Sequence, residues 1–312
     1  MIERAVELLR QGKLVAFPTE TVYGLGADAT NADAIRRIFA AKARPPTNPL
    51  ICHVADESMA RQYAARWPAQ ASAIAAAFWP GPITICVPKV ASIPSEATAG
   101  RDTVGLRAPN HPLTLQLLRA FGKPIAGPSA NKSSHVSPTT AQHVRDELGD
   151  GVDLILDGGP CIVGIESTVL DLSSDRPTIL RPGGVTREQI EAVIGGVDVV
   201  TGIVSPDTAA TSPGQQARHY APRTPAIRVE SDELESISPS HRGLILLNPR
   251  RNIEQSIAVA ILSKDPRIYA RDFYAVLRRL DGLSLDEIVI ELPPDEPAWA
   301  AIRDRIIRAT NS

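Results

Sequence analysis

Apolar residues recur along the chain in two spacings, one typical of helices and the other of short buried strands. At the amino terminus, apolar residues three or four apart predict a helix that stops before Gly12, a residue favoured just after a helix. Asn31 is placed to cap a second helix, which the Pro45-Pro46 pair ends. Alanine-rich helices are expected before Trp79, and another helix at Pro112–Ala120.

Short apolar runs bounded by Gly, Pro or polar residues predict the strands of a first, amino-terminal unit. These runs are Leu14–Phe17, Leu50–Val54, Ile83–Val87, Val104–Leu106, Ile125–Ala126, Leu154–Leu156, Thr168–Leu172 and Ile179–Leu180. Strands that alternate with helices in this way predict a mixed α/β domain with a predominantly β centre.

The composition changes near residue 200, and a chain of 312 residues is long for a single core. Residues 201–225 are rich in Pro, Gly and Ser and have almost no apolar periodicity, which is typical of a linker. Beyond it, strands are expected at Ala226–Val229, Leu244–Leu247 and Ile288–Leu292, and helices at Tyr274–Leu280 and Ala298–Ile307. The chain therefore reads as a domain over residues 1–200, a linker over 201–225 and a small α/β domain over 226–312.

The charge balance argues mildly against a protein that binds nucleic acid through its phosphates, and we expect no strong nucleic-acid binding. The formal net charge is −2, from 33 Lys and Arg against 35 Asp and Glu, and neither predicted domain is basic. The three cysteines are far apart, which fits a reducing compartment and offers no zinc motif. No apolar run approaches the length of a membrane span, so we expect a cytoplasmic protein without membrane contact.

Polar residues at the predicted element ends suggest anion binding without naming a reaction. Lys42 and Arg44 stand at a helix end before a proline-stiffened loop, where two cations can meet a polyphosphate, although exposed helix-end cations are the simpler interpretation. The Pro128-Ser-Ala-Asn131 turn suits phosphate or ribose, or is an ordinary turn. Arg107 and Arg181 each end a strand, where an anion can bind, but surface arginines are common.

Familiar nucleotide and hydrolase motifs are absent from the sequence. There is no GxxxxGK[ST] loop, no GxSxG elbow and no tight cluster of metal-ligating residues. The residues alone thus indicate an α/β protein with anion-binding loops and no evident nucleophile.

Taken together, the motifs resemble the YrdC-like family. Over about the first 195 residues they follow the order of that family, and a second group resembles the linker of its longer, two-domain threonylcarbamoyl-AMP synthases. The first group comprises Phe17-Pro-Thr-Glu-Thr-Val-Tyr-Gly-Leu-Gly26, Lys42-Ala-Arg44, Asn48-Pro-Leu-Ile-Cys-His53, Trp79-Pro-Gly-Pro-Ile-Thr84, Thr103-Val-Gly-Leu-Arg107, Gly127-Pro-Ser-Ala-Asn131, Gly164-Ile-Glu-Ser-Thr168 and Leu180-Arg-Pro-Gly183. The second comprises Ser212-Pro-Gly214 and His219-Tyr-Ala-Pro222.

The resemblance implies a twisted, largely β open sheet with a concave cleft and packed helices, followed by a small Rossmann-like domain. It also implies a nucleotidyltransferase reaction. The amine of L-threonine takes up CO2, supplied as bicarbonate, and the carbamate attacks the α-phosphate of ATP. Pyrophosphate leaves, and threonylcarbamoyl-AMP remains as an intermediate for tRNA modification. Such a reaction needs no enzyme nucleophile, only positioning and charge stabilisation.

The same resemblance assigns residues, carried over motif by motif. Lys42 and Arg44 are expected to act in catalysis. The expected contacts of ATP are Lys42, Arg44, Asn48, Thr103, Ser129, Asn131, Ser137, Arg181 and Tyr220. Tyr220 stands in the linker, which we expect to fold over the cleft as a lid that excludes water. The alternative is that Tyr220 only anchors the linker to the surface of the first domain. The expected contacts of threonine are Thr21, His53, Arg107 and Ser167. Mg2+ is expected on the ATP phosphates rather than in a protein cage, and a transient contact with the downstream tRNA threonylcarbamoyl transferase is a further expectation.

Two other functions stay open at the level of the sequence. YrdC-like domains also occur in carbamoyl-AMP-forming carbamoyltransferases, although those chains carry CxxC segments and a kinase-like domain that this sequence lacks. A non-catalytic RNA-binding module would use the cleft for an RNA backbone, against which the charge balance and the 4% aromatic content weigh. Pyrophosphate release that depends on threonine and bicarbonate separates the three.

Overall fold

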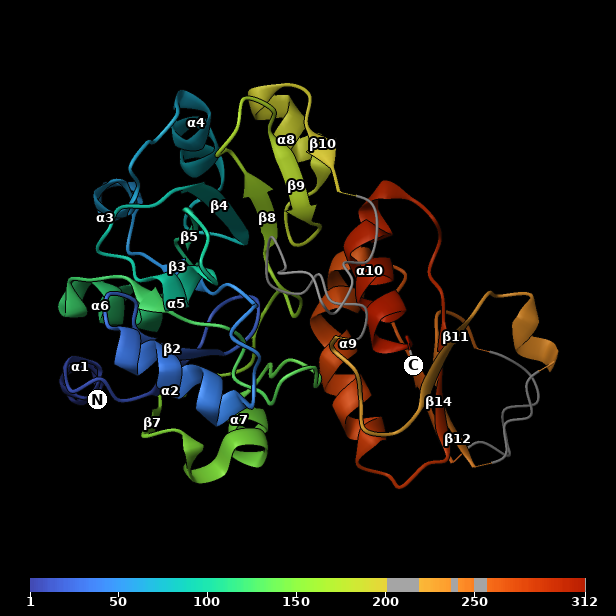
Figure 1. Ribbon diagram of the computed structural model, residues 1–312. Helices are drawn as coiled ribbons and strands as arrows, with labels where there is room; N and C mark the ends of the chain where they lie inside the picture. The colour runs from blue at the N-terminus through green and yellow to red at the C-terminus, as the bar shows by residue number, and fades with distance from the viewer. Residues whose placement is uncertain (201–218, 237–240, 250–256, 312) are drawn as a thin grey trace.

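The computed structural model describes residues 1–200, 219–236, 241–249 and 257–311. In this part of the chain two sheets form, each with helices packed on it (Figure 1). The expected linker at 201–225 lies outside the described residues except for 219–225. No helix in the described ranges is both long and apolar enough to cross a membrane.

The first sheet has ten strands within the described residues, in the order β10-β9-β8-β4-β5-β3-β6-β2-β1-β7. Their bounds are β1 Val15–Phe17, β2 Gly24–Asp28, β3 Ile51–His53, β4 Ile83–Pro88, β5 Thr103–Arg107, β6 Ile125–Ala126, β7 Leu154–Ile155, β8 Thr168–Asp171, β9 Thr178–Arg181 and β10 Asp198–Val199. Parallel and antiparallel pairs are mixed in this sheet. The expected largely β first domain is confirmed.

Helices surround this sheet, and their ends follow from local sequence. They are α1 Ile2–Arg10, α2 Ala32–Lys42, α3 Glu57–Tyr63, α4 Ala69–Phe78, α5 Ser95–Thr98, α6 Pro112–Phe121, α7 Ala141–Leu148 and α8 Arg187–Ile194, with a 3-10 turn at Gly149–Gly151. Asn31 caps α2, as predicted, because its side chain accepts hydrogen bonds from two backbone N–H groups of the first turn. Ala43, in the left-handed conformation with φ of 49°, ends that helix before the prolines.

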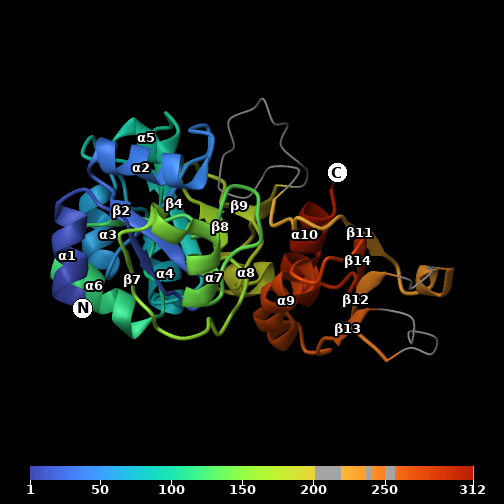
Figure 2. The same ribbon diagram turned by 90° about the horizontal axis from the view of Figure 1, so that it is seen from below.

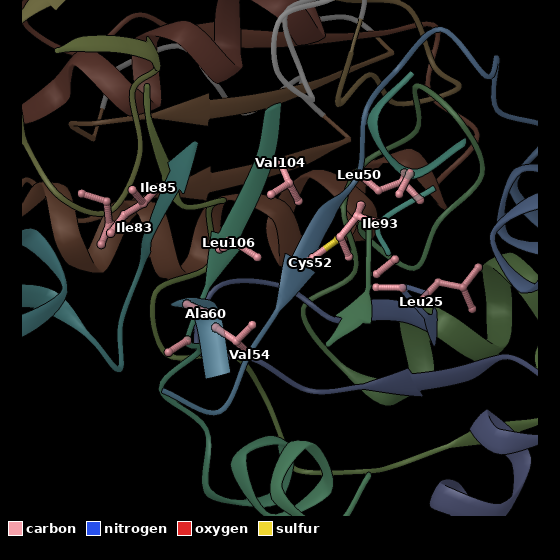
Figure 3. Close-up of a cluster of buried hydrophobic side chains, with 14 of the residues drawn as sticks. Leu25, Leu50, Cys52, Val54, Ala60, Ile83, Ile85, Ile93, Val104 and Leu106 are labelled. Atoms are coloured by element: carbon pink, nitrogen blue, oxygen red, sulfur yellow. The ribbon is translucent and has the colours of Figure 1, made fainter. Parts of the chain in front are cut away.

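Apolar side chains from the central strands β2 to β5 form the centre of the first domain (Figure 3). Leu25 of β2, Cys52 of β3, Ile85 of β4 and Leu106 of β5 are fully buried, and Ala60 of α3 packs against the same cluster. All three cysteines are free and buried. This core holds the strands rigidly, so the residues at the strand ends have fixed positions.

Strand register brings distant motifs together at one edge. β3 pairs with β5 in parallel, which sets His53 opposite Arg107 at the ends of the two strands. β4 pairs with β8 in parallel, so Ser167, just before β8, lies beside the start of β4. Four sequence motifs, on β3, β4, β5 and β8, therefore converge on one region because their strands are neighbours in the sheet.

The carboxy-terminal domain is a small α/β unit with a parallel sheet, as expected. Within the described residues its strands lie in the order β11-β14-β12-β13, namely Ala226–Val229, Glu287–Glu291, Arg242–Leu246 and Ala258–Ile261. Its helices are α9 (Pro266–Asp281) and α10 (Ala300–Ala309), with 3-10 turns at Glu233–Ser236 and Pro297–Trp299. Both views show α9 and α10 between this sheet and the first domain (Figures 1 and 2).

Candidate functional site

A partly open pocket with about 520 Å³ of empty volume lies where the strand-end motifs meet. Seven residues expected from the sequence line it: Arg44, Ser129, Arg181 and Tyr220 from the ATP set, and His53, Arg107 and Ser167 from the threonine set. Its wall also contains Glu166 and His219, which were not among the expected residues. The sequence therefore located the pocket, but it gave an incomplete list of its polar groups.

Arg107 is held in place from behind by a buried acidic side chain. Its Nη2 lies 2.8 Å from Oε2 of Glu20 and donates to Oγ1 of Thr21, also at 2.8 Å. All three side chains are buried, and Thr21 does not line the pocket. Thr21 thus helps to fix the guanidinium of Arg107. Glu20 was missed, although it stands inside the first motif beside Thr21.

His53 lies in the pocket as a neutral imidazole. Burial lowers its pKa to about 3, and the positive charge of Arg107 acts in the same direction. The ring packs edge-on against Phe17, with centroids 5.1 Å apart, and its Nδ1 has no hydrogen-bond partner within the described chain. His53 can therefore give or take a hydrogen bond from a ligand, but it carries no charge at neutral pH.

The interpretation of Lys42 and Arg44 as exposed helix-end cations is wrong. Lys42 is 1% exposed and Arg44 is 7% exposed. The loop of residues 127–131 folds over the end of α2, so that Nζ of Lys42 donates to the carbonyl of Ser129 at 2.5 Å and to that of Asn131. Burial lowers the pKa of Lys42 well below its usual value, and the charge of Arg44 lowers it further. Lys42 thus holds the loop of residues 127–131 in place through hydrogen bonds, while Arg44 lines the pocket.

The other expected ATP residues lie around the pocket rather than in its wall. The side-chain amide of Asn131 donates to the carbonyls of Lys132 and His135, and Ser137 donates to Oε1 of Glu166 at 2.6 Å. Asn48 is buried in the loop after α2. Thr103 lines a second, smaller cavity, which adjoins the first through their shared wall residue Ile51.

Arg181 and Ser167 form the wall of the pocket beside β8 and β9. Nη2 of Arg181 donates to the backbone carbonyl of Ser167 at 2.8 Å, which ties the end of β9 to the segment before β8. The hydroxyl of Ser167 is 2.9 Å from that of Thr84. With Arg44 and Arg107, Arg181 brings a third guanidinium to the same pocket, and anions bind where such groups converge.

His219 and Tyr220 close the pocket on the side of the carboxy-terminal domain. Both are buried, and their rings meet edge-on with centroids 4.0 Å apart. Tyr220 stacks on Tyr274 of α9, with centroids 5.9 Å apart, and the backbone N–H of His219 donates to the carbonyl of Arg308 in α10. Burial lowers the pKa of His219 well below its usual value, and the charge of Arg44 adds to this effect. The pair is therefore seated between the domains.

Several buried polar atoms of this pocket lack partners within the described residues. They are Nε of Arg44, Nδ1 of His53, Nδ1 of His219 and the hydroxyl of Tyr220. A buried polar atom without a partner is costly, so a cluster of them around one cavity indicates a polar ligand. In the described part of the chain, no group of three or more His, Cys, Asp or Glu side chains is arranged to hold a metal ion.

Comparisons with known proteins agree along the whole chain. A family model for Sua5, YciO and YrdC proteins, described as "Telomere recombination", matches residues 7–183. A second model, described as "Threonylcarbamoyl-AMP synthase, C-terminal domain", matches residues 185–311. The threonylcarbamoyl-AMP synthase of Bacillus subtilis is 40% identical over 99% of this chain and 92% of its own, and that of Pyrococcus abyssi is 38% identical over 99% and 94%.

Solved structures extend this agreement to the fold. The crystal structure of P. abyssi Sua5 complexed with L-threonine has a TM-score of 0.91 at 37% identity, covering 99% of this chain and 94% of that one. A structure of a variant of the same protein has a TM-score of 0.92 over 99% and 92%. The chain therefore belongs to the Sua5/YciO/YrdC family, in its two-domain threonylcarbamoyl-AMP synthase form.

Proposed function

We propose that the protein is an L-threonylcarbamoyladenylate synthase, which converts L-threonine, bicarbonate or CO2, and ATP into threonylcarbamoyl-AMP and pyrophosphate for tRNA modification. The observation that carries the proposal is the convergence of Arg44, Arg107 and Arg181 on one pocket. Threonylcarbamoyl-AMP synthases that match this chain over nearly its whole length support it.

The pocket residues divide between the two substrates. Arg107, fixed by Glu20 and Thr21, is placed to bind the carboxylate of threonine, and the neutral His53 beside it to hydrogen-bond the amino acid. Arg44 and Arg181 are placed to bind the phosphates and to stabilise the charge that develops as pyrophosphate leaves. The P. abyssi protein complexed with L-threonine supports the choice of amino acid.

The metal and the partners belong to the proposal as well. We infer that Mg2+ arrives on the phosphates of ATP, where it shields the charge that the carbamate must approach, and that the protein contributes arginines instead of metal-ligating carboxylates. The product is an activated, easily hydrolysed anhydride, so a transient contact with the downstream tRNA threonylcarbamoyl transferase would protect its transfer.

Tyr220 has a role in this reaction through its position over the pocket. Its ring is 1% exposed and its hydroxyl has no partner within the described residues. We propose that it excludes water from the carbamate and the adenylate. Its stacking contact with Tyr274 of α9 supports a position between the two domains over an anchor on the surface of the first domain alone.

The threonine site is tested by removing the charge that should bind the carboxylate. Arg107→Met should raise the KM for threonine by roughly 10-fold or more while changing the KM for ATP much less. Because this change leaves the buried carboxylate of Glu20 without its cation, the Arg107→Met, Glu20→Gln double variant guards against a folding defect. Arg119→Met, at an exposed position of α6, is the control. Unchanged use of threonine by the folded variants would contradict the assignment.

A further inference from the structure

Helix α10 of the carboxy-terminal domain places a fully buried arginine behind the pocket. Nε of Arg305 lies 2.8 Å from Oε2 of Glu166, and its Nη2 donates to the carbonyl of Pro182 at 3.0 Å. Its guanidinium carbon is 5.0 Å from the ring centroid of Tyr220. One side chain thus contacts a wall residue of the pocket, the turn after Arg181, and the residue proposed to cover the nucleotide.

Glu166 is an unexpected group to find in such a pocket. Burial by itself raises its pKa, but the charges of Arg305 and Arg181 outweigh this effect and leave the pKa below its usual value. Glu166 is therefore an ionised carboxylate in the wall of a pocket that should receive a polyphosphate. Without a cation behind it, this carboxylate would repel the substrate.

We propose that Arg305 is a positioning residue through which the carboxy-terminal domain prepares the pocket for a nucleoside triphosphate, by neutralising Glu166 and seating the ring of Tyr220. The inference rests on the proposed function for the identity of the ligand. It gives the carboxy-terminal domain a direct effect on nucleotide binding, in addition to its contact with the segment that carries Tyr220.

A purely structural role for Arg305 predicts something different. Arg278 of α9 already joins the two domains, since it donates to the carbonyls of Val136 and Ser137 and lies 3.2 Å from Oε1 of Glu147. Neither Arg278 nor Glu147 lines the pocket. Loss of Arg278 therefore weakens the contact between the domains, whereas loss of Arg305 also removes a cation from the carboxylate of Glu166, a residue of the pocket wall that Ser137 and Tyr274 hydrogen-bond as well.

The test measures ATP affinity by titration calorimetry in the full-length chain. The variants are Arg305→Met, Arg278→Met and Glu166→Gln, together with each of the two arginine variants combined with Glu166→Gln. Arg305→Met should weaken ATP binding by roughly 10-fold or more, because it unmasks a buried charge. Adding Glu166→Gln should restore most of the affinity, since the repelling charge is gone. Adding Glu166→Gln to Arg278→Met should give no such recovery. If Arg305→Met does not fold, the same comparison is made with Arg305→Gln, which keeps a hydrogen-bond donor but not the charge and should weaken ATP binding until Glu166→Gln is added.

Failure of rescue by Glu166→Gln, or equal rescue of Arg278→Met, would overturn the inference. So would unchanged ATP affinity in Arg305→Met. Because the readout is binding, it does not depend on turnover. A wild-type chain that binds ATP but releases no pyrophosphate with threonine and bicarbonate would instead contradict the proposed function.

Discussion

At the scale of single residues, the site is built from buried charges whose partners are mostly backbone carbonyls and a few carboxylates. Lys42 is the clearest case, because both described hydrogen bonds of its side chain go to carbonyls of the loop that forms one wall of the pocket. Arg107 similarly depends on Glu20. Such residues shape the site by holding neighbours in place, so their removal should affect stability as well as binding.

Lys42→Met should therefore lower the free energy of unfolding, by about 1–3 kcal/mol, because the backbone carbonyls of Ser129 and Asn131 lose a donor. It should also raise the KM for ATP, since Ser129 of the released loop lines the pocket. Arg37→Met, at an exposed position of the same helix, is the matched control and should change neither quantity. Urea unfolding and initial rates measure both. A Lys42→Met protein as stable as the control would show that the loop needs no fastening.

His53 makes the stability depend on pH. The pKa of His53 in the folded protein is about 3, below the ordinary value of 6.5, so the unfolded chain takes up the proton first. Stability is then complete above pH 6.5 and declines as pH falls toward 3, by up to about 1.4 kcal/mol per pH unit. His53→Gln should show a shallower decline in urea unfolding between about pH 7 and pH 5. Parallel curves for the two proteins would contradict a neutral, buried His53.

At the scale of elements, one tight backbone contact fixes the position of the pocket wall that Ser167 and Arg181 form. A Cβ added to Gly183, in the turn after β9, would lie 2.2 Å from the backbone N of Thr168 and 2.3 Å from the backbone C of Ser167. Backbone atoms cannot turn aside as a flexible side chain can, so the turn and the start of β8 would have to separate.

Gly183→Ala should thus cost about 3 kcal/mol or more of unfolding free energy and weaken ATP binding. Gly196→Ala is the control, because a Cβ there meets nothing within 4 Å. Thermal melting of both variants, with ATP titration of whichever folds, measures the effect. Equal melting temperatures would mean that the turn is not tightly packed against β8.

The sequence predicted most elements because their apolar runs are distinct, and it missed those without such a run. β2 escaped detection because Gly24 and Gly26 interrupt it, and both glycines are needed where the strand passes the ring of Phe17. The pocket was predictable because its residues stand at strand ends in recognisable motifs. The burial of Lys42 and the role of Arg305 were not, because they depend on segments far apart in sequence folding over one another.

At the scale of the whole molecule, the two domains share one site. The first domain supplies the arginines, and the helices α9 and α10 of the second lie against it (Figures 1 and 2). Tyr220 contacts Tyr274 of α9 and Arg305 of α10. The described residues of the second domain thus contribute contacts to the pocket wall. The central claim is that this shared pocket joins threonine, CO2 and ATP in one reaction.

Pyrophosphate release by the full-length protein, with the nucleotide product identified by mass spectrometry, tests that claim most directly. With ATP, Mg2+, L-threonine and bicarbonate together, the account predicts pyrophosphate and an equal amount of threonylcarbamoyl-AMP. Omission of either threonine or bicarbonate should abolish both products. Pyrophosphate release that is indifferent to threonine, or that yields only AMP or carbamoyl-AMP, would contradict it.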